Sequence, residues 1–395
     1  MENIVIVDCI RTGLAKAHRG TFNMTRSDDL VAHCIDALLT RNPQLDPAQV
    51  DDVVLGCGRQ IGEQSGNVAR HAVALSQLPI TVPATTISRA CSSGLNSIAI
   101  AATQIASGCA EIMLAGGVES ITGLSRGTPG EFAENPRLMS EKPDMYMAMG
   151  NTAEVVARRY QVTREAQDAY ALSSQQRYAA AEAAGYIKDE IAPMTVQWEK
   201  IVDKETKATA IVESTVDKDE CNRANTTLDG LTKLSPAFEE GGSVTAGNSS
   251  QLSDGASMVL LMTEKKAIEL GVTPMGYFRG FAVAGCEPDE MGIGPVFAIP
   301  KLLQYKGLSL NDIDLVELNE AFASQCLYSR DRLGIDPDIY NVNGGSIAIG
   351  HPFGMTGARL TGGLLRELQR RNKKYGIVSM CIGKGMGAAG LFEAI

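Results

Sequence analysis

The stretch SRACSSGLNSIAIAATQIASGCAEIMLAGG, residues 88–117, holds a turn, a helix and a strand in immediate succession. Small polar residues surround Cys91, and the helix expected over 94–107 is apolar nearly all round. A helix without a polar face is covered on both sides. The stretch therefore predicts a layered α/β fold in which the Cys91 end of the helix points into the molecule or into a deep cleft.

A second stretch, GHPFGMTGARLTGGLLRELQRRNKKYGIVSMCIGKG (350–385), repeats this order of small-residue turn, helix and strand ending in glycines. Residues 308–324 likewise resemble residues 45–60. Two similar halves predict a duplicated α/β fold. Residues 121–250 differ, with polar loops, two amphipathic helices and a charged stretch typical of an insertion. We expect an N-terminal half over 1–120 plus 251–271, a loop domain over 121–250, and a C-terminal half over 272–395.

Two further helices carry capping signals. SDDLVAHCIDALLT (27–40) predicts a helix capped by Ser27, with acidic residues in its first turn. Thr163 is the expected N-cap of a helix over 163–184.

Bulk composition excludes several classes of protein. The chain has 395 residues, a net charge of −10 and a pI near 5.1, which argues against a nucleic-acid binder or a ligand of anionic membranes. No segment reaches about 18 uninterrupted apolar residues, the length expected of a membrane span. The nine cysteines are scattered without a C-x-x-C pair, and only four histidines are present. We therefore expect a cytoplasmic protein with neither a disulfide framework nor a metal site.

Four chemically notable side chains fall where strands are expected to end: Cys91, Asn319, His351 and Cys381. Each has a structural alternative, since buried thiols, hydrogen-bonded histidines and turn-forming asparagines are common. The N-terminus of a helix would favour the thiolate of Cys91. Together the four provide a nucleophile, a base, a second thiol for proton transfer and amide donors for an oxyanion.

Six segments resemble the successive signature segments of the thiolases: SRACSSGL, VTAGNSSQLSDGAS, MGIGPVFAIPKLL, ELNEAFASQ, GGSIAIGHPFGMTGAR and SMCIGKGMGAAGLFE. The resemblance covers essentially the whole chain. It implies duplicated βαβαβαββ halves in a five-layered αβαβα arrangement, with an inserted loop domain that binds coenzyme A.

The resemblance also implies a role for each candidate. Cys91 would be acylated to a thioester, and His351 would take its proton. Cys381 would move a proton at the α-carbon of acetyl-CoA. His351, with a water held by Asn319, would form one oxyanion hole, and the backbone N–H groups of Cys91 and Gly383 would form a second.

Coenzyme A would be held by five residues that match contacts in the family: Arg223 on the adenine, Ser250 on the pantetheine arm, and Met149, Phe238 and Met291 along the pantetheine and acyl pocket. CoA and acyl-CoA would be substrates, with no permanently bound cofactor. A homodimer, or a homotetramer, is implied.

Three positions depart from the family pattern. Ser88 stands where thiolases usually carry asparagine, Lys384 replaces a small residue in the glycine loop, and Ala148 stands where biosynthetic acetoacetyl-CoA thiolases have histidine. Together with the short 121–150 segment, these features favour a degradative 3-ketoacyl-CoA thiolase of fatty acid β-oxidation. The biosynthetic acetoacetyl-CoA thiolase remains the alternative.

Two other classes of protein also remain open. A decarboxylating ketosynthase is disfavoured because such relatives lack the second cysteine, which is present here as Cys381. A thiolase-like CoA- or lipid-binding protein that has lost catalysis is the alternative that is not an enzyme.

Overall fold

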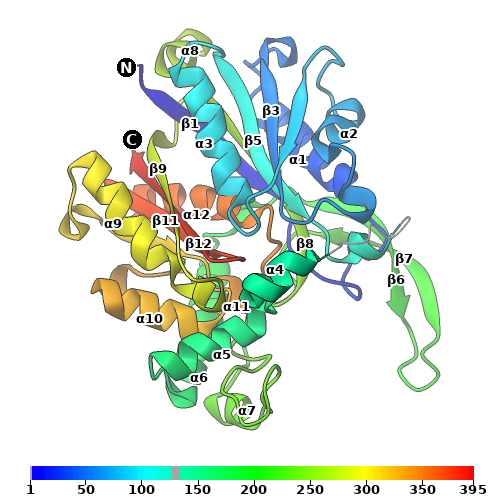
Figure 1. Ribbon diagram of the computed structural model, residues 1–395. Helices are drawn as coiled ribbons and strands as arrows, with labels where there is room; N and C mark the ends of the chain where they lie inside the picture. Colours follow the sequence, from blue (N-terminus) through cyan, green and yellow to red (C-terminus); the bar gives the residue numbers. More distant parts are fainter. Residues whose placement is uncertain (1, 127–133) are drawn as a thin grey trace.

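The computed structural model describes residues 2–126 and 134–395, and its core is a sheet of ten strands (Figure 1). In spatial order the strands are β10 (Leu315–Leu318), β11 (Tyr375–Ile382), β12 (Met386–Ala394), β9 (Gly276–Gly285), β1 (Ile4–Arg11), β8 (Ser253–Thr263), β5 (Ile112–Glu119), β3 (Asp52–Cys57) and β4 (Ala84–Ile87), with the short β2 (Ala15–Lys16) beside β8.

The sheet consists of two halves with related pairing. Strand β3 is parallel to β4 and β5, and β10 is parallel to β11, whereas β5–β8 and β11–β12 are antiparallel. Within the described strands, the two half-sheets meet at a short antiparallel pairing between β1 and β9, through Val5 with Tyr277 and Ile6 with Gly276. The duplication expected from the repeated stretches is therefore present in the strand pairing.

Helices form three layers around these two half-sheets (Figure 1). Helices α3 (Ser93–Ala106) and α12 (Thr356–Arg370) pack on each other and share one apolar core with both half-sheets. Helices α1 (Ser27–Arg41) and α2 (Val68–Leu75) cover the N-terminal half-sheet, and α9 (Gly294–Lys306) and α10 (Ala323–Leu333) cover the C-terminal one. The five-layered arrangement implied by the resemblance is confirmed, and α3 is covered on both sides as its composition predicts.

Glycines allow the central helices to approach the strands closely. A Cβ on Gly117 of β5 would overlap the carbonyl of Gly354, and one on Gly357 of α12 would overlap the backbone of Leu95 in α3. Side chains at these positions would push the central layer apart.

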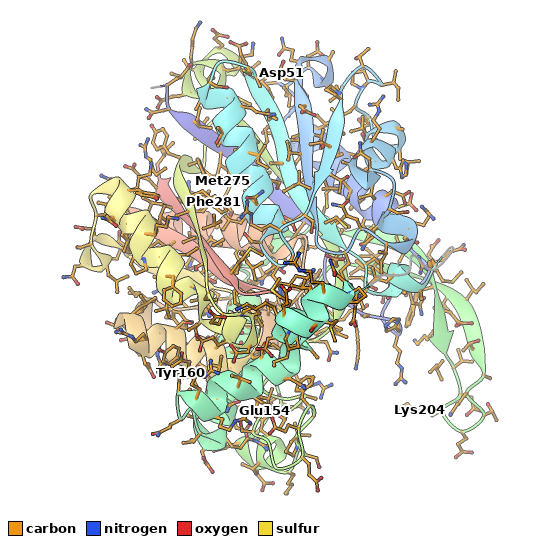
Figure 2. The ribbon with its side chains drawn as sticks, viewed as in Figure 1. Asp51, Glu154, Tyr160, Lys204, Met275 and Phe281 are labelled. Atoms are coloured by element: carbon orange, nitrogen blue, oxygen red, sulfur yellow. The ribbon has the colours of Figure 1, made fainter. Side chains whose placement is uncertain are left out.

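The chain between β5 and β8 covers one end of this core. It contains α4 (Pro136–Glu141), α5 (Met149–Arg159), α6 (Arg164–Ala183), the hairpin β6 (Met194–Ile201) and β7 (Thr209–Val216), and α7 (Leu228–Thr232). Helices α5 and α6 pack on α10 and on α11 (Ser346–Ile349). The hairpin is a separate sheet that projects from the molecule, with Lys204 at its tip (Figure 2).

The remaining helices are α8 (Glu264–Leu270) and short 3-10 turns: η1 (Pro47–Gln49), η2 (Gly62–Gln64), η3 (Thr122–Ser125), η4 (Pro143–Tyr146), η5 (Lys188–Glu190), η6 (Pro288–Ile293), η7 (Leu310–Asp312) and η8 (Pro337–Ile339). Among the residues that the structure describes, no helix is long and apolar enough to cross a membrane. All nine cysteines are free thiols.

One capping prediction is confirmed and one is wrong. The Thr163 side chain caps α6 by accepting the N–H of Ala166. Ser27 is instead the first residue of α1, and the N-cap position belongs to Arg26. The N–H of Ser27 donates to the carboxylate of Glu63 at 3.0 Å, so a side chain from a distant segment does the work of a local cap.

Candidate active site

Cys91 lies in a tight turn between β4 and α3. Ala90, immediately before it, has φ of 44°, a left-handed conformation that is costly for a residue with a Cβ. The hydroxyl of Ser93 stabilises this turn, since it accepts the N–H of Arg89 at 2.9 Å and donates to the Ala90 carbonyl at 2.7 Å. The Cys91 side chain stays partly exposed, so a substrate can reach it.

The thiol of Cys91 is protonated in the resting structure. Burial raises the pKa of Cys91 to about 11, and the charge of Glu119 adds to this rise, while hydrogen bonds from the backbone N–H groups of Gly383 and of Cys91 itself lower it. The N–H groups at this turn favour the thiolate, as expected, but their effect is smaller than that of burial. The helix begins only at Ser93, and burial outweighs the N–H donors.

His351 is buried beside the N-terminus of α12. Its Nδ1 lies 2.7 Å from Oγ1 of Thr356, which in turn donates to the carbonyl of Pro352 at 2.9 Å. Burial, followed by the positive charge of Arg359, lowers the pKa of His351 to about 3. The imidazole is therefore neutral near pH 7, with one of its two ring nitrogens unprotonated.

Asn319 follows strand β10 and meets His351. Its backbone N–H donates to the carbonyl of Ser379 on β11 at 2.9 Å, which fixes the turn. Its side-chain Nδ2 lies 3.1 Å from Nε2 of His351, and its Oδ1 accepts the hydroxyl of Ser346 at 2.7 Å. The pair expected from two widely separated sequence segments is thus in direct contact.

Cys381 is fully buried near the end of β11. Burial raises the pKa of Cys381 well above its usual value, and the negative charges that Cys91, Cys326 and Cys286 would carry as thiolates raise it further. The charge of Cys91 has the largest effect of the three, which fits two thiols that lie near each other.

Cys381 belongs to a cluster of packed apolar side chains. Its other buried members are Ala153, Val244, Met291, Ala321 and Phe322, and Met149 packs against them. Phe238 meets Phe322 edge to face, with ring centroids 6.0 Å apart. The three apolar CoA-pocket residues expected from the sequence therefore come together here.

Helix α5 is tied to this cluster by a hydrogen bond. The carboxylate of Glu154 accepts the N–H of Val244 at 2.7 Å, and its place on α5 can be followed in Figure 2.

The two polar residues expected to bind CoA differ in their surroundings. The Ser250 N–H donates to the carbonyl of Ala321, a member of the cluster, at 2.9 Å. Arg223 is exposed, and its backbone N–H donates to the side chain of Gln175.

Glu119, at the end of β5, is a site residue that the sequence reasoning missed. Its buried carboxylate accepts the N–H groups of Gly58 at 2.8 Å, Arg59 at 3.1 Å and Gly354 at 3.0 Å, and the side-chain amide of Gln64 at 2.9 Å. It therefore ties the strand ends near Cys91 to the loop that carries His351. Burial raises the pKa of Glu119 to about 7. An acidic residue at a strand end was the available signal.

The three departures lie at or near this site. The Ser88 hydroxyl donates to the carbonyl of Gly58 at 3.1 Å, joining the ends of β4 and β3. Lys384 has φ of 72° and Gly385 has φ of 81°, so the loop after Gly383 holds a lysine in a left-handed conformation. Ala148 is exposed at the N-cap of α5.

The described residues offer no group of three or more His, Cys, Asp or Glu side chains able to hold a metal ion. A surface hollow of about 1500 Å³ lies elsewhere, between α1, η5 and α12, and none of the candidate residues lines it. The site combines a partly exposed thiol, a neutral imidazole bonded to an amide, and a second, buried thiol. These groups lie at the strand ends of a duplicated five-layered fold. Together they define a thiol-dependent enzyme of the thiolase fold.

Comparisons with known proteins agree with this class. The family models "Thiolase, N-terminal domain" and "Thiolase, C-terminal domain" match residues 4–265 and 272–394. The chain is 49% identical to the 3-ketoacyl-CoA thiolase of Bacillus subtilis (strain 168), over 100% of both chains. It is 45% identical to the human peroxisomal 3-ketoacyl-CoA thiolase, over 99% of this chain and 91% of that one.

Two solved structures share the fold. The Bacillus anthracis acetyl-CoA acetyltransferase superposes with a TM-score of 0.89 at 38% identity, covering 100% of this chain and 99% of that one. Human mitochondrial 3-ketoacyl-CoA thiolase gives a TM-score of 0.88 at 37% identity with the same coverage. The chain belongs to the thiolase family.

Proposed function

We propose that this chain is a 3-ketoacyl-CoA thiolase, an acyltransferase that cleaves 3-ketoacyl-CoA with CoA through an acyl-enzyme on Cys91. The observation that carries the proposal is the 3.1 Å contact between Nδ2 of Asn319 and Nε2 of His351, because it brings together the base and the amide expected from two distant segments. The names of the relatives from Bacillus subtilis and human peroxisomes support the degradative direction.

The first half-reaction transfers the acyl group to the enzyme. The Cys91 sulfur attacks the 3-keto carbon while neutral His351 takes the thiol proton. The backbone N–H groups of Cys91 and Gly383 stabilise the oxyanion at that carbon. The bond between the α-carbon and the 3-keto carbon then breaks, and the enolate of acetyl-CoA leaves. Cys381 protonates its α-carbon, and His351, with a water held by Asn319, stabilises the enolate oxygen.

The second half-reaction releases the product. The proton on His351 returns to Cys381, so both groups regain their resting states. The thiol of CoA attacks the thioester carbonyl as His351 takes its proton, and the Cys91 sulfur leaves and is reprotonated. The product is an acyl-CoA shortened by the two carbons that left as acetyl-CoA. No group beyond the chain and CoA is needed.

Mass spectrometry of the intact protein tests the acyl-enzyme. Acetoacetyl-CoA without free CoA is expected to leave an acetyl group on the wild-type protein and none on Cys91→Ala. If the wild type stays unmodified while it binds acetoacetyl-CoA, the chain is a CoA-binding protein instead of an enzyme.

Chain-length preference separates the degradative proposal from the biosynthetic alternative. Thiolysis of a long-chain 3-ketoacyl-CoA at a rate comparable to that of acetoacetyl-CoA is the expected result. Activity confined to acetoacetyl-CoA would favour the acetyl-CoA C-acetyltransferase. We also propose Arg223 and Ser250 as CoA contacts, so that Arg223→Ala raises the KM for CoA and leaves kcat nearly unchanged.

We propose that the protein is a homodimer, or a homotetramer built from two dimers, in the cytoplasm. The support for self-association is that β4 ends the strand order, and an edge strand can pair with a second copy. Free thiols throughout the chain fit a reducing compartment. Light scattering on the purified protein and fractionation of its own cells test these two points.

A further inference from the structure

A continuous row of hydrogen bonds connects Arg359 on α12 to the imidazole of His351. The Nη2 group of Arg359 donates to Oγ of Ser346 at 3.0 Å. The Ser346 hydroxyl donates to Oδ1 of Asn319 at 2.7 Å. The Nδ2 group of Asn319 lies 3.1 Å from Nε2 of His351. All four side chains are buried, so these contacts are shielded from exchange with solvent.

The chemistry of the groups fixes the direction of every bond in this row. A guanidinium can only donate, so the Ser346 oxygen accepts from Arg359 and its single proton goes to Oδ1 of Asn319. Because Oδ1 of Asn319 accepts the Ser346 proton, the Nδ2 side of the same amide faces Nε2 of His351 and donates an N–H to it. Nε2 must then be the unprotonated, accepting nitrogen.

The other side of the imidazole agrees with this assignment. Nδ1 of His351 then holds the ring proton and donates to Thr356 Oγ1 at 2.7 Å, and Thr356 passes its own proton to the Pro352 carbonyl at 2.9 Å. Every donor in the row from Arg359 to Pro352 therefore points the same way.

We propose that Arg359 and Ser346 are positioning residues that fix the side-chain orientation of Asn319 and, through it, the tautomer of His351 in which Nε2 is unprotonated. The catalytic role of this tautomer rests on the proposed function, because Nε2 must be unprotonated to take the proton of Cys91 in place of the hydrogen bond from Asn319. If the Asn319 amide rotated by half a turn, its oxygen would face Nε2 and favour the tautomer with a proton there. That tautomer cannot accept a proton from the thiol at this nitrogen.

The Ser346 hydroxyl has no part in holding its own loop. The neighbouring backbone is held on both sides by other groups, since the Gly345 N–H donates to Ser174 Oγ at 3.1 Å and the Ile347 N–H donates to Glu320 Oε2 at 3.1 Å. Ser346→Ala therefore removes the hydrogen-bond relay and leaves the loop in place.

Nuclear magnetic resonance of the ¹⁵N-histidine-labelled protein reads the tautomer directly. The chain has four histidines, so His351 is assigned as the signals lost in His351→Ala. The wild type is expected to show the Nδ1–H tautomer, and Ser346→Ala is expected to shift the population towards Nε2–H. Ser329→Ala is the matched control, because Ser329 is equally buried and its hydroxyl has no partner among the described residues.

Two results of this measurement would overturn the proposal: an Nε2–H tautomer in the wild type, or an unchanged tautomer in Ser346→Ala. Arg359→Gln is expected to shift the tautomer as Ser346→Ala does. Arg366→Gln, on the same helix, is expected to leave it unchanged, because Arg366 bonds instead to the Cys9 carbonyl. The same shift in Arg366→Gln would also overturn the proposal. If Arg359→Gln does not fold, Ser346→Ala decides alone.

A double-mutant cycle tests whether Ser346 acts through Asn319. Ser346→Ala is expected to slow acylation of Cys91 about 10- to 100-fold, the range typical of residues that orient a reacting group, with little change in KM. In the Asn319→Ala background the same change is expected to cost nothing further. The proposal would be overturned if the double variant lost acylation rate by the product of the two single-variant losses. If the wild type shows the expected tautomer but no acylation, the proposed function fails and the relay stands.

Discussion

The protonation state of Cys91 before substrate arrives leads to a quantitative prediction about alkylation. Burial raises the pKa of Cys91 to about 11 and lowers that of His351 to about 3, so both shifts oppose a thiolate–imidazolium pair before substrate binds. Because the folded-state pKa of the thiol is raised, the thiol stays protonated at every pH below about 11. Iodoacetamide reacts with the thiolate, so alkylation measures this directly.

The expected rate follows from two opposing effects. At pH 7.5 the thiolate fraction of Cys91 is about 300-fold below that of a free cysteine with a pKa of about 8.5. A thiolate of higher pKa is the better nucleophile. With a Brønsted coefficient of about 0.45, the pKa difference of about 2.5 makes each Cys91 thiolate about 13-fold more reactive. Alkylation of Cys91 should therefore be about 20-fold slower than that of a free thiol.

The assay maps alkylated peptides by mass spectrometry between pH 7 and pH 10. The rate at Cys91 is expected to rise about tenfold per pH unit with no plateau, because only the thiolate reacts. Exposed Cys109 is the reference within the same molecule. Prior treatment with acetoacetyl-CoA should protect Cys91 and leave Cys109 reactive. A plateau below about pH 8 would refute the reasoning, since it would mean that a thiolate–imidazolium pair exists before substrate binds.

Three substitutions test other parts of the site. Cys381→Ala should still be acylated on Cys91 but fail to exchange the α-protons of acetyl-CoA with deuterium, and exchange at the wild-type rate would remove Cys381 from the mechanism. Glu119→Gln replaces one of the two carboxylate oxygens that accept four N–H groups, so some of these hydrogen bonds are lost. Urea titration should show a loss of about 2–4 kcal/mol in the free energy of unfolding. An unchanged free energy would mean that Glu119 does not hold the strand ends to the His351 loop. Gly150→Ala places a Cβ against the ring of Phe238, so steady-state kinetics should show a several-fold higher KM for CoA at similar kcat, and an unchanged KM would place Phe238 outside the CoA pocket.

The elements that the sequence predicted best are those set by local pattern. The apolar helix after Cys91 and the strands around it follow from hydrophobic periodicity, and the rule that functional groups gather at strand ends led to Asn319 and His351. The family resemblance implied that Asn319 and His351 share one oxyanion hole through a water, and the direct contact between their side chains could not be predicted from periodicity.

The hydrogen-bond partners could not be predicted in the same way. Glu119 and Gly354 are 235 positions apart, and only the packing of the two halves brings them together. The raised pKa of Cys91 likewise depends on burial by the rest of the molecule, whereas the sequence shows only a nearby helix start. Ser27 failed as a cap for the same reason, because its partner Glu63 comes from another segment.

The place of β1 in the sheet has a consequence for how the chain is made. Its eight residues, IVIVDCIR, are all buried between β8 and β9, yet β8 begins only at Ser253. From Arg11 to Ser253 is 242 positions, so at about 5–20 residues per second the ribosome needs about 12–50 s to supply this partner. During that time an apolar strand with both edges unpaired is open to aggregation. Strand β1 is thus synthesised long before its partners β8 and β9, and it cannot complete its place in the sheet until they emerge.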